Sequence, residues 1–357
     1  MPHKNFCIGK IEVGEGCVPL VIPEIGINHN GELDVAKAMV YSAYRAGAKL
    51  IKHQTHVVED EMSNAAKSVV PGNADSSIYD IMKNAALSEE EEYELMQYTE
   101  SLGMEFLSTP FSRVAADRLH RFGVKAYKIG SGEMNNYPLL EHIASFGKPM
   151  IVSTGMNAIP DIRKAVEILE KHDVPYALLH TTNLYPTKPE QVRLGAMQQM
   201  MTAFPETIIG LSDHTTNNNA CISAMALGAM IVERHFTDRM DRNGPDIVCS
   251  MDEQNLRLLL EASQEVSLML GGEKKALAEE QVTIDFAFAT VVTIKPIKKG
   301  EAFTKENLWV KRPGTGEIRA EEYHKILGKK AKVDIENDIH LTRNMIEENE
   351  NIYATIY

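Results

Sequence analysis

The sequence contains few cysteines and no long apolar run. Its four cysteines lie far apart and form no CxxC pair, which argues against a disulfide scaffold. They are Cys7, Cys17, Cys221 and Cys249. No stretch of about 18 consecutive apolar residues occurs, so the sequence predicts no membrane-spanning helix. The first ten residues also lack the apolar segment of a signal peptide. We therefore expect a cytoplasmic protein with free thiols.

Positive charge is also in short supply. Lys and Arg number 37 against 50 Asp and Glu, which gives a formal net charge of −13. This balance argues against nucleic acid or an anionic membrane as a partner. An anionic substrate would have to be held by a few local basic residues. The hydrophobic content of 44% is typical of a globular protein, and the length of 357 residues predicts about two domains.

Several catalytic motifs are missing. The sequence has no G-x-S-x-G, no Walker motif, no HExxH and no Cys/His nucleophile arrangement, so covalent nucleophilic catalysis is disfavoured. A Schiff base on Lys52 or Lys128 stays open, because a desolvated lysine can form one. No G-x-G-x-x-G follows an apolar run, which disfavours an open nucleotide-binding sheet.

Eight short apolar runs alternate with amphipathic segments from residue 20 onward. The runs are residues 20–30, 50–55, 105–110, 126–132, 149–155, 176–183, 208–214 and 230–236. They begin with continuous apolar residues, as strands covered on both faces should. Glycines such as Gly47 and Gly123 follow the amphipathic segments, where a left-handed residue ends a helix. The order predicts a (β/α)8 barrel over residues 1–271, with residues 1–19 as a hairpin across its floor.

Other segments do not follow this alternation of apolar runs and amphipathic segments. Residues 56–82 form a long excursion, which predicts a functional lid or binding loop. Ser88 and Glu91 predict a capping box at the start of the following helix. Residues 272–284 are polar and predict a linker. Residues 285–350 hold short β-like runs broken by Lys-Gly and Pro-Gly turns, which predicts a second, small domain.

Polar residues close all eight runs, on the face where barrels of this type carry active sites. They are Glu24, Asn28, His29, Lys52, Gln54, Thr109, Lys128, Ser131, Glu133, Ser153, Thr154, His180, Asn183, Tyr185, Ser212, Asp213, His214, Glu233, Arg234 and His235. Two lysines and four hydroxyls among them predict a cradle for phosphate or carboxylate. These are Lys52, Lys128, Thr109, Ser131, Ser153 and Ser212. The alternative is that the hydroxyls cap the following helices.

Two histidines end neighbouring strands. The imidazoles of His214 and His235 can share one divalent ion there, or they can be hydrogen-bonded core residues. Four other histidines near the same face compete as ligands: His29, His53, His56 and His180. Glu24 and Glu133 are candidates for a general acid or base, or for pairing with a lysine.

Arg312 stands out in the second predicted domain. It lies within LWVKRPGTG, residues 308–316, where the following Pro-Gly turn would hold it on a fixed loop. One interpretation is an arginine presented to a substrate that is bound by another domain or subunit. The other is a solvated arginine on an exposed turn.

Longer motifs in both domains carry a family resemblance. They read IKHQTHVVEDEMS, PGNADSSIYDIM, YKIGSGE, IGLSDHT, ERHFTDRMDRNGPDIVCSM and NLWVKRPGTG. With them the chain resembles the bacterial N-acetylneuraminate (sialic acid) synthases from about residue 5 to about residue 347. Residues 51–63 and 71–82 are most similar to the members that use N-acetylmannosamine. The resemblance implies a (β/α)8 barrel followed by an antifreeze-like (SAF) domain, in a homodimer with swapped C-terminal domains.

The resemblance also implies a reaction. Phosphoenolpyruvate, N-acetylmannosamine and water would give N-acetylneuraminate and phosphate, with Mn2+ or Mg2+ as cofactor. The metal ligands would be His214 and His235. Phosphoenolpyruvate would contact Lys52, Thr109, Lys128, Ser131, Ser153, Asn183 and Ser212. The sugar would contact Gln54, Asn73, Glu133, Tyr185, Asp246 and Phe286, with Arg312 supplied by the partner subunit. Glu24 would lie near the reacting centre, and Glu133 would shuttle a proton.

Three other functions stay open. A sister enzyme that makes legionaminic or pseudaminic acid from a 2,4-diacetamido-trideoxy hexose would share the chemistry and differ in its sugar pocket. A Schiff-base aldolase acting on pyruvate would need no metal. A carbohydrate-binding or ice-binding protein, suggested by the C-terminal domain alone, would have no use for eight polar strand ends.

Overall fold

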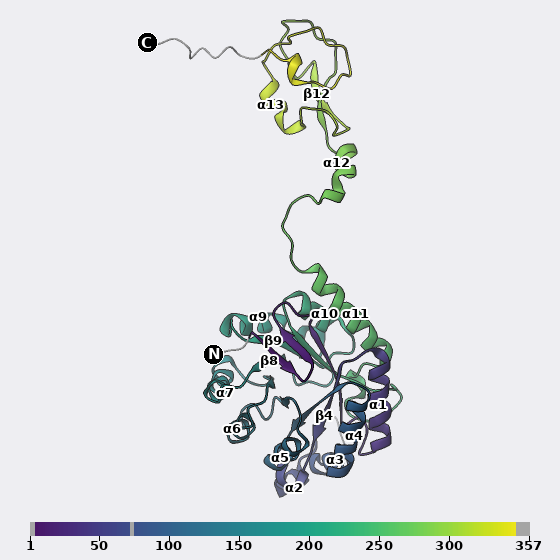
Figure 1. Ribbon diagram of the computed structural model, residues 1–357, viewed down its shortest axis with the longest axis vertical. Coiled ribbons are helices and arrows are strands. Elements are labelled where there is room, and N and C mark those ends of the chain that lie inside the picture. The colour runs from purple at the N-terminus through teal and green to yellow at the C-terminus, as the bar shows by residue number, and fades with distance from the viewer. Residues whose placement is uncertain (1–3, 72–74, 348–357) are drawn as a thin grey trace, which may run out of the picture. The chain divides into compact units, whose positions relative to one another are not determined.

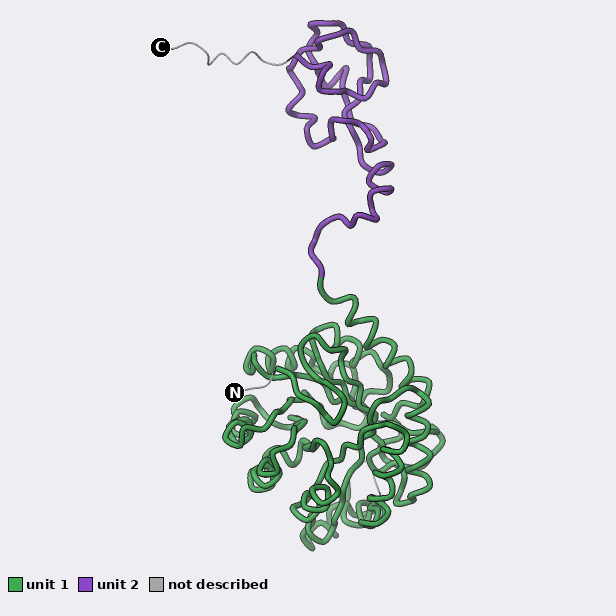
Figure 2. Tube along the Cα trace, viewed as in Figure 1, with its two compact units in different colours: residues 1–271 green, residues 272–357 purple. Residues whose placement is uncertain are grey.

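The chain forms two compact units, residues 1–271 and 272–357 (Figure 2). The structure is a computed structural model that describes residues 4–71 and 75–347. No helix in these ranges is long and apolar enough to cross a membrane.

The first unit is built on a closed parallel barrel of eight strands, as predicted from the alternating pattern. The strands are β3 (Leu20–Gly26), β4 (Leu50–Thr55), β5 (Glu105–Pro110), β6 (Tyr127–Ile129), β7 (Met150–Ser153), β8 (Tyr176–Thr181), β9 (Ile208–Asp213) and β10 (Ile231–His235). Neighbours in sequence are neighbours in space, and β10 closes the barrel on β3 with His235 opposite Glu24. The strands end earlier than the apolar runs. For example, β3 stops at Gly26, whose φ of 49° turns the chain into the following loop.

Helices surround the strands on the outside of the barrel (Figure 1). They are α1 (Leu33–Ala46), α4 (Glu89–Ser101), α5 (Arg113–Phe122), α6 (Tyr137–Ala144), α7 (Ile159–Lys171), α8 (Pro189–Val192), α9 (Leu194–Ala203), α10 (Asn219–Ala226) and α11 (Glu253–Met269). The capping box expected at α4 is present, since Ser88 Oγ accepts from Glu91 N at 3.2 Å and Glu91 Oε2 accepts from Ser88 N at 2.9 Å. Gly47 ends α1 in the left-handed conformation, as the sequence predicts.

Apolar side chains fill both sides of the strands. One cluster lies between strands and helices and includes Val21, Ile51 and Leu178. A second cluster includes Ile22 and Leu50, the alternate residues of the same strands. This double burial explains why the strands read as continuous apolar runs.

A hairpin of β1 (Asn5–Ile8) and β2 (Ile11–Gly14) precedes the barrel. Its side chains Phe6, Ile8 and Val13 join the same cluster as Leu20 and Leu50, which begin barrel strands. The hairpin therefore closes the end of the barrel at which the strands begin.

The segment after β4 is more ordered than the long loop that the sequence indicates. It contains the short helices α2 (Val58–Glu61), η1 (Asn64–Ser68) and α3 (Ile78–Ala85). Ser77 caps α3 by accepting from Asp80 N at 3.1 Å. Asn73, which the resemblance assigns to the sugar, lies outside the described residues.

The second unit has its own core. It comprises η3 (Ala278–Glu280), α12 (Gln281–Ala287), β11 (Thr290–Thr293), β12 (Leu308–Lys311), η4 (Ala320–Glu322), α13 (Tyr323–Ile326) and η5 (Arg343–Met345). The strands β11 and β12 pair antiparallel over a cluster that contains Val291, Phe303 and Leu341. Because η3 and α12 begin within the expected linker, residues 272–284, that linker is helical in its second half.

In the first unit, η2 (Ile247–Cys249) lies in the loop between β10 and α11.

Candidate active site

A cavity of about 200 Å³ lies at the carboxyl ends of the barrel strands. Its lining includes fourteen of the residues singled out from the sequence: Glu24, Lys52, Gln54, Thr109, Lys128, Ser131, Glu133, Ser153, Asn183, Tyr185, Ser212, His214, Glu233 and His235. Asp246 is adjacent, with its Oδ2 atom 3.8 Å from His235 Nδ1. Phe286 and Arg312 belong to the second unit, where both side chains are exposed.

Two buried lysines line the cavity, each beside a carboxylate. Lys128 Nζ donates to Ser153 Oγ at 2.6 Å and lies 3.4 Å from Glu233 Oε1. Burial lowers its pKa, although the neighbouring Glu233 carboxylate opposes the shift. Lys52 forms an ion pair with Glu24, and burial lowers the pKa of Lys52 to about 7. A bound anion would favour the charged form of both ammonium groups.

Small groups beside the lysines leave space for a ligand. Ser131 Oγ accepts from Gly155 N at 3.0 Å. A Cβ atom on Gly155 would lie 1.7 Å from Asn183 Oδ1, so any larger residue there would force the Asn183 side chain to move. Ser212 Oγ donates to Glu233 Oε1 at 3.1 Å. The hydroxyls of Ser131, Ser153 and Ser212 thus face other cavity groups, and they do not cap the following helices.

Some polar atoms of the cavity are buried and lack a hydrogen-bond partner in the described part of the chain. They are Thr109 Oγ1, Asn183 Oδ1, Glu233 Oε2 and His235 Nδ1. A buried polar atom without a partner costs free energy, and proteins rarely retain one unless a ligand or water completes it. These atoms therefore mark the cavity as a binding site for a polar molecule.

His214 and His235 lie together at the ends of β9 and β10, with ring centroids 5.4 Å apart. His214 Nδ1–H donates to Thr182 O at 2.8 Å, which leaves Nε2 with a free lone pair. Burial lowers the pKa of His214 to about 4 and that of His235 to about 3, so both rings are neutral near pH 7. Neutral imidazoles are ligands for a divalent ion.

The donor set fits a divalent ion with open positions. Within residues 4–71 and 75–347, no group of three or more His, Cys, Asp or Glu side chains could hold a metal. The two imidazoles would therefore need oxygen atoms from substrate or water as further ligands. Unpartnered His235 Nδ1 and the free Nε2 of His214 supply the observation behind this fit.

Two carboxyl groups occupy different environments. Glu24 accepts from Gln54 Nε2 at 2.7 Å and pairs with Lys52, which agrees with the pairing interpretation. Burial raises the pKa of Glu133 to about 7, with the Glu61 carboxylate adding to the effect. A carboxyl group with a pKa near 7 can donate and accept protons at neutral pH.

The competing histidines make other contacts in the structure. His53 Nδ1 lies 3.2 Å from Glu92 Oε1 of α4, and His180 Nε2 donates to Val192 O at 2.8 Å. His56 Nδ1 lies 2.8 Å from Glu61 Oε2 of α2. His29 Nδ1 accepts from Gly31 N at 3.2 Å. The described cavity lining includes none of the four.

Glu233 is the cavity residue whose role sequence reasoning missed. It lies in β10 two residues before His235, so both side chains lie on the same face of the strand. Its carboxylate contacts Lys128 and Ser212. The two-residue spacing between Glu233 and His235 was the signal available in the sequence. The contact between Glu233 and Lys128 on β6 could not be predicted, because it forms only when the barrel closes. By contrast, Thr154 donates to Leu179 O at 2.9 Å and does not line the cavity.

Comparison with known proteins places the chain in a family. Residues 39–275 match the NeuB family. The chain belongs to the NeuB family. Residues 288–347 match the SAF domain, which confirms the C-terminal domain type expected from the resemblance.

Relatives of this NeuB-family chain include several synthases. It is 36% identical to N,N'-diacetyllegionaminic acid synthase of Campylobacter jejuni, over 89% of this chain and 97% of that protein. It is 30% identical to human N-acetylneuraminate-9-phosphate synthase, over 92% of each chain. The crystal structure of sialic acid synthetase from Leptospira borgpetersenii, in complex with citrate, matches with a TM-score of 0.72 and 29% identity. That match covers 79% of this chain and 95% of the Leptospira chain.

Proposed function

We propose that this chain is a phosphoenolpyruvate-dependent N-acetylneuraminate synthase. The observation that carries the proposal is the cavity itself, where two buried lysines and unpartnered polar atoms lie beside two neutral imidazoles. Membership of a family that contains sugar-acid synthases supports the same conclusion.

The lysines and hydroxyls suit the phosphate and carboxylate of phosphoenolpyruvate. Lys128 and Lys52 would neutralise the two anionic groups, because buried ammonium groups interact strongly with anions in a low-dielectric cavity. Ser131, Ser153 and Ser212, with Thr109 and Asn183, would supply hydrogen bonds at the same wall. The protein needs only this local charge, so its overall negative charge is no obstacle.

The sugar would occupy the side of the cavity near Gln54 and Tyr185, with Asp246 adjacent. Its open-chain aldehyde carbon would face carbon 3 of phosphoenolpyruvate. When bound, a divalent ion held by His214 and His235 supplies Lewis acidity that polarises the aldehyde. Either Mn2+ or Mg2+ is proposed for this role.

The reaction balances with phosphoenolpyruvate, the sugar and one water. Carbon 3 attacks the aldehyde carbon to form the new C–C bond, and the aldehyde oxygen takes a proton from Glu133. Water then adds to the cationic carbon 2 and returns a proton to Glu133. The resulting tetrahedral intermediate loses inorganic phosphate through C–O cleavage, which leaves the ketone of N-acetylneuraminate. The raised pKa of Glu133, about 7, supports this double use.

The second unit would complete the site in a homodimer with swapped C-terminal units. Phe286 is 59% exposed and Arg312 is exposed, so both are available to a neighbouring barrel. We propose that Arg312 of one subunit orients the sugar in the other through its N-acetyl group.

A sister activity is the second candidate. The 36% identity to a diacetyllegionaminic acid synthase favours a 2,4-diacetamido-trideoxy hexose as the substrate. The condensation would be the same, and only the contacts to the sugar would differ.

The first experiment measures phosphate release from phosphoenolpyruvate with each sugar, with and without EDTA. Mass spectrometry identifies the product. EDTA-sensitive release with N-acetylmannosamine and a nine-carbon acetamido acid would support the proposal. Activity only with the diacetamido hexose would keep the reaction and replace N-acetylmannosamine with that hexose as the substrate. Inactivity with both sugars, together with borohydride trapping of pyruvate on Lys52 or Lys128, would show that the protein is a Schiff-base aldolase and not a synthase.

A further inference from the structure

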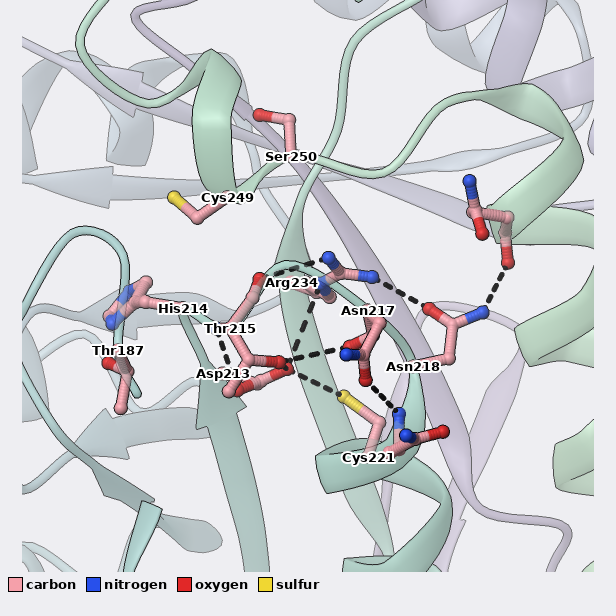
Figure 3. Close-up of polar contacts among 12 residues, drawn as sticks. Thr187, Asp213, His214, Thr215, Asn217, Asn218, Cys221, Arg234, Cys249 and Ser250 are labelled. Carbon is pink, nitrogen blue, oxygen red and sulfur yellow. Dashed lines mark hydrogen bonds and ion pairs between the residues drawn. The ribbon is translucent and has the colours of Figure 1, made fainter. Parts of the chain in front are cut away.

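A buried arginine connects the two strands that carry the paired histidines. Arg234 lies in β10 directly before His235, and about 1% of its side chain is exposed. Its guanidinium donates from one terminal nitrogen to Thr215 O at 3.0 Å and from the other to Asn218 Oδ1 at 2.7 Å. Its Nε atom lies 3.7 Å from Asp213 Oδ2 (Figure 3).

The partners of Arg234 flank His214. Asp213 ends β9 directly before His214, and Thr215 follows it. Asp213 also accepts from Thr215 at both carboxylate oxygens, from the backbone N at 3.0 Å and from Oγ1 at 2.8 Å. Figure 3 shows this arrangement, with His214 lying apart from the polar contacts around Arg234. The chain on either side of His214 is therefore tied to one guanidinium.

Further contacts fix the rest of this turn. Asn218 Nδ2 donates to Asn255 O of α11 at 2.8 Å, and Cys221 Sγ of α10 lies 3.7 Å from Asp213 Oδ2. On the other side, Thr187 N donates to His214 O at 2.9 Å. Arg234 is the side chain in this set that is adjacent in sequence to His235 and contacts both neighbours of His214, through a hydrogen bond to Thr215 and an ion pair with Asp213.

We propose that Arg234 is a positioning residue that sets the separation of the His214 and His235 imidazoles. The inference rests on the metal site of the proposed function. Two ligands can share an ion only if both ring nitrogens lie about 2 Å from it, so a small shift of either strand end breaks the pair. A planar guanidinium can hold three partners in fixed directions, whereas a lysine ammonium cannot reproduce that fork.

The test is Mn2+ binding to the full-length protein, measured by electron paramagnetic resonance of free Mn2+. Arg234→Lys keeps the charge and should raise the Mn2+ dissociation constant by about 10- to 100-fold, the range typical of residues that orient metal ligands. Asn218→Ala removes one acceptor without leaving a buried charge unpaired, and it should give a smaller rise. His214→Ala should abolish binding, which identifies the site of the signal.

Arg118→Lys is the matched control. Arg118 is also a largely buried arginine in an ion pair, since its NH1 donates to Glu92 Oε2 at 3.1 Å. It lies on α5, and its described partners are on α4, away from the two imidazoles. The control should lower the melting temperature and leave Mn2+ affinity unchanged.

The outcomes separate this inference from the function on which it rests. Wild-type Mn2+ affinity in a folded Arg234→Lys variant would overturn the inference alone, because Arg234 would then be merely structural. If Arg234→Lys does not fold, unchanged affinity in Asn218→Ala overturns it. A wild-type protein that binds no Mn2+ overturns the inference together with the metal site, and EDTA-insensitive phosphate release would then show that the condensation itself survives.

Discussion

Burial changes the protonation of the side chains that line the cavity. It lowers the pKa of Lys52 to about 7 and that of His214 to about 4, and it raises the pKa of Glu133 to about 7. Each shift favours the neutral form, because a charged group loses hydration on burial. Near pH 7 the cavity thus carries fewer charged groups than its composition implies, and an anionic substrate would draw protons onto the lysines.

We expect Glu133→Gln to lower kcat by about 100-fold or more, since an amide cannot donate the proton that the aldehyde oxygen needs. In the wild-type enzyme, kcat should fall as pH rises through about 7, where Glu133 loses its proton. The measurement is phosphate release across pH 5.5–9. Glu61→Gln removes a nearby negative charge and should move the descending limb to lower pH. Full turnover by Glu133→Gln would remove Glu133 from the mechanism.

The same group should affect stability with a defined sign. The pKa of Glu133 is raised from 4.5 to about 7 in the folded state, so the unfolded state loses its proton first and stability falls as pH rises between these values. Glu133→Gln removes this penalty. Urea unfolding should show the variant more stable than wild type by about 3 kcal/mol at pH 8, and equal at pH 4. An identical difference at both pH values would contradict the shifted pKa.

Sequence alone located many cavity residues but not their partners. Lys52 and Lys128 were predictable, because a lysine at the end of a continuously apolar run has few alternatives to a functional site. The histidines were harder. Since both faces of each strand are buried, no alternation of polar and apolar residues shows which face His53 or His214 occupies. The same ambiguity hid the contact between Glu233 and Lys128, which depends on barrel closure.

The loop after β7 packs against the cavity residues Ser131 and Asn183, and Gly155 in that loop leaves no room for a Cβ atom unless those side chains move. A Cβ atom there would overlap Asn183 Oδ1 and lie 2.8 Å from Ser131 Oγ. We expect Gly155→Ala to lower kcat/KM for phosphoenolpyruvate by about 100-fold, because both groups must move. Gly195→Ala on α9, where a Cβ meets nothing within 4 Å, is the control and should behave as wild type. Steady-state kinetics of both variants, with phosphoenolpyruvate as the varied substrate, measures this change. A wild-type kcat/KM in Gly155→Ala would contradict the prediction.

The loop between β10 and α11 carries Asp246 and is fastened by the loop after β3. Asn28 Nδ2 donates to Phe236 O at 2.9 Å and to Ser250 Oγ at 3.0 Å. Asn30 Nδ2 donates to Asn243 O at 2.8 Å. The asparagines past the end of β3 thus act on the position of a predicted sugar contact.

We expect Asn28→Ala to raise the KM for the sugar several-fold while the KM for phosphoenolpyruvate stays near its wild-type value. The variant should also lose about 1–3 kcal/mol of stability, because Phe236 O is left without its donor in a buried position. Kinetics with each substrate varied in turn, beside thermal unfolding, measures both effects. Equal changes in the two KM values would show that the loop does not act on the sugar alone.

The second unit holds its α12 helix firmly. Gly314 N donates to Asp285 O at 2.6 Å, and the Arg319 guanidinium lies 5.7 Å from the Phe288 ring centroid. A Cβ on Gly314 would lie 2.5 Å from Ile284 O, so the close approach needs glycine. Phe286 and Arg312 therefore belong to one body.

Complementation tests whether this body acts in a neighbouring subunit. His214→Ala damages the barrel site, and Arg312→Ala damages the second unit, so each variant alone should be inactive or nearly so. Co-expression in equal amounts should restore activity to about one quarter of the wild-type sites, because half of randomly formed swapped dimers are mixed and each mixed dimer has one intact site. No recovery would show that Arg312 does not act across subunits.

Closure of the barrel between its first and last strands also constrains how the protein can be made. Glu24 and His235 face each other across that seam, yet most of the barrel separates them in the chain. During synthesis the edge of β3 that pairs with β10 must therefore remain unpaired until residue 235 has left the ribosome. Lys52, Lys128 and His214 are already present by then, but the wall that β10 supplies is not. We therefore expect affinity for small molecules to arise in one late step, so that an unfinished chain offers no partly working enzyme.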